Sequence, residues 1–165
     1  AGDDVDLHWR ALVREAELGG DITAPSAALL ERDPDPDAWV RALTVRAALP
    51  DPAAKDEVWQ RLAVDREVPV HAVAPVAAAF WRPGQDAQLA PYAERYLAAV
   101  PQLHQGGMIP AMTYATQLFP PYAVDAAYIE KAQRTAREAA PVVRNTLLGR
   151  ADAVRRMLRA RSATA

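Results

Sequence analysis

The residues best suited to chemistry in this chain are three histidines, and their spacing keeps them apart. His8, His71 and His104 lie far from one another, and none has a second His, Cys or Glu three or four residues further on. The H-E-x-x-H helix of zinc peptidases is absent, as are a G-x-S-x-G turn, a Walker loop and a G-x-G-x-x-G turn. The chain has no cysteine, so it has no thiolate. The sequence therefore predicts no catalytic residue, no metal ligand set and no cofactor site in this chain.

A second candidate for chemistry is the acidic cluster Asp3, Asp4 and Asp6. Three neighbouring carboxylates could hold a cation, but the cluster lacks the glycine and the bidentate glutamate of a calcium loop. Carboxylates at a helix start also accept from free amides and oppose the helix dipole. We therefore expect them to begin a helix over about Asp4–Leu18, which Gly19-Gly20 ends.

A third candidate is a basic group near the C-terminus. Residues 131–165 hold nine bases and two acids, whereas residues 1–70 hold eight bases and fifteen acids. One interpretation is a pair of oppositely charged, solvated helix faces; the other is a basic face that meets a partner. The candidate basic face consists of Arg144, Arg155, Arg156 and Arg159.

Other features argue against nucleic acid and membrane partners. The net charge is −2, and the aromatic residues are too dispersed to form a platform for stacked bases. No apolar run reaches the ~18 residues of a membrane-spanning helix, and the acidic N-terminus does not resemble a secretory signal. We therefore expect no nucleic acid, no membrane and a cytoplasmic location.

Large apolar residues are expected to serve packing. Four tryptophans fall on, or at the edge of, apolar helix stripes, which predicts core positions. Met108 and Met112 lie one helical turn apart and are interpreted as gap fillers rather than a ligand pair. The tryptophans are Trp9, Trp39, Trp59 and Trp81.

The composition predicts an all-α fold. Alanine makes up more than a fifth of the chain and arginine outnumbers lysine seventeen to two, and both abundant residues favour helices. Asp35-Pro36 and Asp51-Pro52 repeat one helix-start signal, an acidic cap followed by proline. A helix pair then takes roughly 30–35 residues, the length of a helical repeat. We expect a single domain over residues 1–165, an α-α superhelix of about 8–9 antiparallel helices like HEAT or armadillo arrays.

The pivot of this arrangement is an aromatic corner in the middle of the chain. An alanine-rich apolar run ends in Phe80-Trp81, and Pro83-Gly84 then forces a turn because proline interrupts the helical ladder. A new helix follows at once, so the region is expected to form an αα-hairpin. The predicted structural corner and interdomain contact comprises Phe80, Trp81, Arg82, Pro83, Gly84 and Gln85.

The residues of this corner also carry a resemblance to a known family. The chain resembles the C-terminal helical domain of actinobacterial aminopeptidase N, a zinc-dependent metallo-aminopeptidase of the gluzincin type. The most specific part is the Phe-Trp-x-Pro-Gly-Gln core, and weaker similarities extend over almost the whole chain. They lie in His8–Leu12, Ala53–Trp59, Leu89–Tyr96 and Leu148–Ala160.

The resemblance implies a function that this chain would not perform alone. In that family a separate thermolysin-like domain holds the zinc and hydrolyses N-terminal residues from peptides. The helical domain packs over it, closes a chamber and limits substrate access. By this resemblance the chain is roughly the second half of such a domain, zinc is expected only in the missing catalytic domain of the same polypeptide, and peptide substrates are met only indirectly.

Two other functions stay open, together with one consequence of the fragment interpretation. The chain could be a free-standing α-solenoid module that binds a protein. It could also be a helical-repeat nucleic-acid-binding protein that uses the arginines of its last helix, although the acidic N-terminal half argues against this. If preceding repeats are missing, the first helix pair exposes apolar side chains, and self-association through residues 5–32 is expected.

Overall fold

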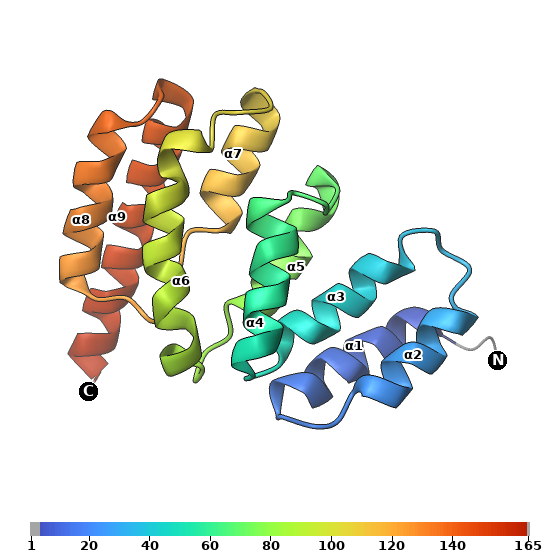
Figure 1. Cartoon of the computed structure of the whole chain (residues 1–165). Coiled ribbons are helices and arrows are strands. Elements are labelled where there is room, and N and C mark those ends of the chain that lie inside the picture. The colour runs from blue at the N-terminus through green and yellow to red at the C-terminus, as the bar shows by residue number, and fades with distance from the viewer. Residues whose placement is uncertain (1–3, 165) are drawn as a thin grey trace. The chain divides into compact units, whose positions relative to one another are not determined.

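The computed structural model describes residues 4–164, and helices dominate it (Figure 1). No β-strand occurs in this part of the chain, so the expected all-α fold is confirmed. The nine α-helices formed by residues 4–164 also match the expected number. They are α1 (Val5–Glu17), α2 (Thr23–Arg32), α3 (Ala38–Ala48), α4 (Pro52–Trp59), α5 (Val73–Phe80), α6 (Asp86–Ala99), α7 (Met108–Gln117), α8 (Ala126–Glu138) and α9 (Pro141–Thr164).

Three short irregular helices complete the element order. The π-helical turn η1 (Gln60–Val64) continues α4, while the 3-10 turns η2 (Val70–Ala72) and η3 (Val100–Gln102) precede α5 and follow α6. The helices form two compact units, Ala1–Gln88 and Leu89–Ala165. Stacked helix pairs in each unit are consistent with an α-α superhelix. The single domain over residues 1–165 stays a prediction.

Unit 1 is organised around α3. This helix packs against α1 and α2 on one side and against α4 and α5 on the other (Figure 1). Its buried residues Val40, Leu43 and Val45 are therefore shared among several helix contacts. The core of this unit also contains three packed aromatic residues, Trp59, Phe80 and Trp81. Their ring centroids lie 5.2–6.4 Å from one another. Every tryptophan of the chain lies in this unit.

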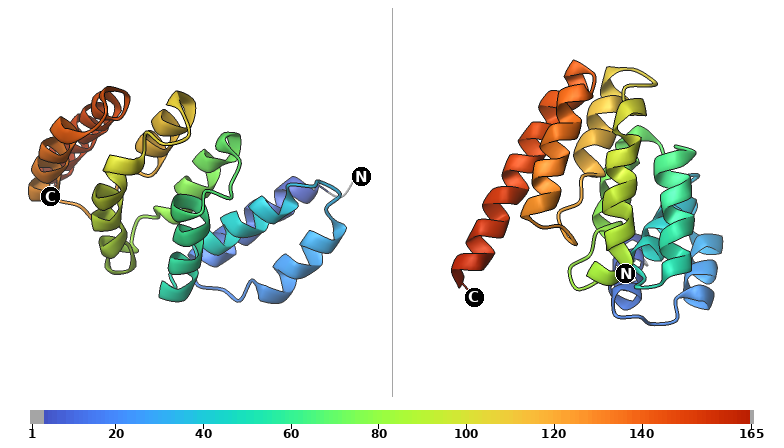
Figure 2. Two further views of the ribbon diagram at one scale, coloured as in Figure 1. Left: turned by 45° about the horizontal axis from the view of Figure 1, so that its top comes forward. Right: turned by 60° about the vertical axis from the view of Figure 1, so that its left-hand side comes forward.

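Unit 2 is organised around α9, which packs side by side with α8 and also contacts α7 (Figure 2). Two buried tyrosines tie its helices together: Tyr96 Oη donates to the main-chain oxygen of Ala115 and Tyr128 Oη to that of Ala93, each at 2.7 Å. Phe119 packs edge-on against both rings. Burial raises the pKa of both phenols, so these hydroxyls stay protonated donors.

The helix starts test the capping predictions. Asp4 Oδ1 accepts from Leu7 N at 3.1 Å, so Asp4 caps α1; Asp3 lies outside the described residues. Asp51 caps α4 with Pro52 in its first turn, as expected. The Asp35-Pro36 prediction is wrong, because α3 begins at Ala38. Asp35 Oδ1 instead accepts from Asp37 N at 2.9 Å, which forms a local turn before the helix.

The expectation that all four tryptophans are core residues is correct for three of them. Trp39 is only half-buried. Its ring lies in a groove between α2 and α3, and the Arg61 guanidinium covers it at 5.1 Å from the ring centroid. A cation over an indole face stabilises a partly exposed tryptophan without full burial.

Candidate functional site

The three histidines remain separate in the folded chain. His8 lies on α1, His71 in η2 and His104 in the loop after η3. Within residues 4–164 no group of three or more His, Cys, Asp or Glu side chains is arranged to hold a metal ion. The zinc that the resemblance implies is expected in a catalytic domain outside this chain, and that expectation stays a prediction.

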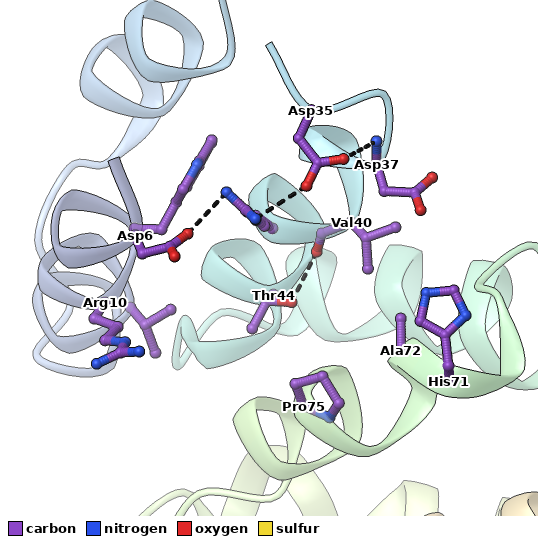
Figure 3. A pocket seen from close by; sticks show the side chains of 12 residues that line it. Asp6, Arg10, Asp35, Asp37, Val40, Thr44, His71, Ala72 and Pro75 are labelled. Atoms are coloured by element: carbon purple, nitrogen blue, oxygen red, sulfur yellow. Dashed lines mark hydrogen bonds and ion pairs between the residues drawn. The ribbon is translucent and has the colours of Figure 1, made fainter. Parts of the chain in front are cut away.

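A cluster of charged side chains lines a cleft of about 460 Å³ in unit 1. Figure 3 shows Asp6, Asp35 and Asp37 at its rim, with His71 and Pro75 below them. Arg41 occupies the place that a bound cation would need. Its guanidinium lies 2.9–3.0 Å from carboxylate oxygens of three aspartates. These are Asp6, Asp33 and Asp35.

The electrostatics of this cleft indicate that its charged residues have a structural role. Asp33 is the centre of the cluster, since its carboxylate accepts from Asp35 N at 3.0 Å and from Trp9 Nε1 at 2.7 Å. These two hydrogen bonds, assisted by the Arg41 charge, hold the pKa of Asp33 below its usual value. The cluster fixes α1 and the α2–α3 loop to α3.

A second cluster surrounds the aromatic corner, and its central residue is Lys55. This side chain is completely buried. Its Nζ donates to the main-chain oxygens of Ala47 at 2.6 Å and Phe80 at 2.8 Å. These carbonyls close the last turns of α3 and α5, where intrahelical partners are lacking and the dipole favours a cation. Lys55 thus links three helices, because it lies on α4 itself.

Gln85, at the other end of the corner, adds a further hydrogen bond of the same kind. We call the side chains of Lys55 and Gln85 and the carbonyls they pair the Lys55 and Gln85 clip. Its Nε2 donates to the main-chain oxygen of Ala48 at 2.9 Å, so a further carbonyl at the end of α3 is paired. Of the predicted corner residues, Phe80, Trp81 and Gln85 are buried. Arg82 is half-buried, whereas Pro83 and Gly84 are exposed at the tip of the turn, with Gly84 at φ +82°. An interdomain contact through this corner stays a prediction.

The buried position of Lys55 predicts a pH-dependent stability. Burial, and secondarily the charge of Arg82, lowers the pKa of Lys55 to about 7 from 10.5. Between these values the unfolded chain binds a proton that the folded chain has released, so the stability of unit 1 should rise as the pH rises from 7 towards 10. The neutral amine keeps two N–H groups, enough for its two carbonyl acceptors.

Urea unfolding at pH 7 and pH 9 measures this effect. Comparison of the wild type with Lys55→Met isolates the lysine, because the variant keeps the volume and loses the titrating group. We expect the unfolding midpoint of the wild type to increase with pH relative to that of the variant. Parallel pH profiles for the two proteins would show that the lysine does not titrate in this window.

The candidate basic face lies on α9, and most of its guanidinium groups have partners within unit 2. Arg144 Nη2 donates to the main-chain oxygen of Ala139 at 3.1 Å, and Arg155 Nη2 donates to Gln133 Oε1 at 2.6 Å. Arg156 forms an exposed ion pair with Asp152. Arg159 is exposed, and together with Arg155 it lines a groove of about 630 Å³ between α8 and α9. A partner for this face stays a prediction.

Sequence reasoning did not single out Lys55, although a signal for it exists. The positive residue stands on the buried side of its helix beside Ala54, Val58 and Trp59, in a segment otherwise suited to packing. A lysine within an apolar stripe must find hydrogen-bond acceptors or remain unpaired. Which carbonyls it meets depends on the packing of α3 and α5, which the sequence of α4 alone does not contain.

Comparison with known proteins found two similarities, one to a family of domains and one to a single protein. Residues 3–156 match the sequence profile of the ERAP1-like C-terminal domain. The chain is also similar to a protein named aminopeptidase N from Streptomyces lividans, with 35% identity over 97 residues. That alignment covers 59% of this chain and 11% of the relative's length, so the chain corresponds to a small part of that protein.

Proposed function

Because the chain belongs to the family of ERAP1-like C-terminal domains, we propose that it is the non-catalytic helical domain of a zinc-dependent aminopeptidase that removes N-terminal residues from peptides. The observation that carries this proposal is the family match over residues 3–156, almost the whole chain. The similarity to an aminopeptidase N supports the same enzyme type. Zinc and the residues that act on the peptide bond are assigned to another part of the polypeptide.

The role that we propose for the chain is to cover the catalytic domain and to limit the access of substrates. Two features of unit 1 support a rigid cover. The Lys55 and Gln85 clip pairs carbonyls at the ends of α3 and α5, and the Arg41 cluster ties α1 to α3. A cover that excludes solvent must keep its shape, and these contacts provide that rigidity without reactive groups of their own.

Self-association of this chain through residues 5–32 is part of the proposal. Three leucines of this segment, Leu7, Leu18 and Leu30, are exposed, which supports a surface that buries against another body. No helix within residues 4–164 is long and apolar enough to cross a membrane. A cytoplasmic location stays a prediction.

The test begins with the reading frame that encodes this chain. The proposal expects an H-E-x-x-H motif upstream of it and a catalytic portion that, expressed separately, associates with the 165-residue chain in sedimentation velocity. A 1:1 complex is the expected result. If the frame holds no such motif, or if the two polypeptides sediment independently, the proposal is overturned in favour of a free-standing interaction module.

A further inference from the structure

One segment of the chain lacks formal charge over an unusual length. Between Arg95 and Asp125 there is no Asp, Glu, Lys or Arg, although these residues make up 24% of the chain. The segment contains the end of α6, η3, the loop after it and all of α7. Its buried residues explain part of this composition, but the segment also has an exposed surface that carries no charge.

The exposed surface is the N-terminal end of α7. Met108, Ile109 and Met112 expose 66%, 68% and 46% of their surface. Met112 stands four residues after Met108 and three after Ile109, so its side chain neighbours both of them on the helix surface. The opposite face, with Ala111, Tyr114 and Ala115, is buried within unit 2. We call the three exposed residues the α7 face.

The α7 face corrects the expectation that Met108 and Met112 fill gaps in the core. The helix begins directly after Gly107, whose φ of +102° turns the chain into α7. From that start the register brings Ala111 and Tyr114 inward and the two methionines outward. The spacing of Met108 and Met112 by one helical turn is compatible with a buried face or with an exposed face. The start of α7 at Met108 places both methionines on the exposed face.

The chemistry of the α7 face restricts what could cover it. Nucleic acids and anionic lipid surfaces require Lys or Arg, and the charged terminus of a peptide requires an opposite charge; the segment offers neither. Depletion of charged residues in the centre of a patch is instead typical of protein–protein interfaces. Methionine is common at such surfaces because its flexible thioether adapts to the partner.

We propose that the α7 face docks onto an apolar surface of the remaining part of the aminopeptidase polypeptide. This inference rests on the proposed function, because that function supplies the partner. The length of the relative supports this inference. The aligned region accounts for 11% of that protein, so most of the relative's polypeptide lies outside the region that matches this chain. Three large apolar side chains on one helix face form the compact, uncharged centre that a stable contact between domains needs.

The test measures binding of the 165-residue chain to the separately expressed upstream portion of its own reading frame. The variant Ile109→Asp introduces a charge into the centre of the α7 face. It should fold normally, because residue 109 is exposed in the first turn of α7, where a carboxylate interacts favourably with the helix dipole. We expect the dissociation constant to rise at least about tenfold, the loss typical of a central interface residue.

The matched control is Val64→Asp, which places the same charge at another exposed β-branched residue, outside both the α7 face and residues 5–32. It should leave binding to the upstream portion unchanged within about twofold. A wild-type chain that does not bind at all refutes the proposed function. A wild type that binds while Ile109→Asp binds equally well refutes the α7 face alone.

Hydrogen–deuterium exchange of the complex gives a second readout that needs no variant. The first turn of α7 should exchange more slowly in the complex than in the free chain, because docking covers it. Unchanged exchange there would contradict the proposal. A reduction of self-association by Ile109→Asp in the free chain, with no effect on the complex, would assign this face to a second copy and overturn the inference.

Discussion

Replacing Lys55 by alanine is expected to lower the free energy of unfolding of unit 1 by about 3 kcal/mol, the size of effect that leaving buried carbonyls unpaired can produce. The substitution removes both hydrogen bonds that Nζ donates, to Ala47 and Phe80, and leaves these main-chain oxygens buried. It also leaves a cavity where the side chain lay. Relief of the cost of burying an ammonium offsets part of the loss.

The measurement is urea unfolding followed by tryptophan fluorescence. Because all four tryptophans lie in unit 1, this signal reports that unit. Lys55→Met is the informative companion, because it fills the cavity but cannot donate, and we expect it to lose about half as much stability as the alanine variant. A loss below about 0.5 kcal/mol for Lys55→Ala, the range of ordinary surface substitutions, would contradict the role of Lys55 as a clip.

Replacing Phe80 by alanine is expected to cost about 4 kcal/mol, the usual range for truncating a buried aromatic residue. Phe80 is fully buried, and its ring centroid lies 5.6 Å from that of Trp59 and 5.2 Å from that of Trp81. Its removal opens a cavity beside two buried indole rings that already contact each other, with centroids 6.4 Å apart, so we expect little collapse to compensate. The Lys55 ammonium also loses the ring beneath it, at 5.0 Å from the centroid.

The control for this variant is Val64→Ala in the same unit. Val64 is exposed, so its truncation should change stability by less than about 0.5 kcal/mol. Both variants are measured by the same fluorescence signal. Equal stabilities of Phe80→Ala and the wild type would show that the aromatic corner does not hold unit 1 together.

The sequence predicted the helices well because their signals are local. Caps such as Asp4 and Asp51 act within three residues of themselves. In α9 the apolar residues Val143, Leu147 and Ala151 repeat every four positions, and all three are buried. A local rule failed at Asp35. Its carboxylate accepts from Asp37 N and so forms a turn before α3, instead of capping the first turn of that helix.

The parts that the sequence did not predict depend on contacts between distant residues. Lys55 acquires its role only when the ends of α3 and α5 meet at its Nζ, 8 and 25 residues away. The exposure of the α7 face depends on which side of that helix unit 2 covers. The motif Phe80–Gln85 did carry the family resemblance, and the family match over residues 3–156 agrees with it.

The central claim is that this chain supplies structure to a reaction whose chemical groups lie elsewhere in the polypeptide. The most direct measurement is the hydrolysis of an alanine 4-nitroanilide by the purified 165-residue chain, with one equivalent of Zn²⁺ added. We predict no release of 4-nitroaniline above the rate without protein, and activity only when the upstream portion of the reading frame is present. Release of 4-nitroaniline by the chain alone, in proportion to its concentration, would contradict this account.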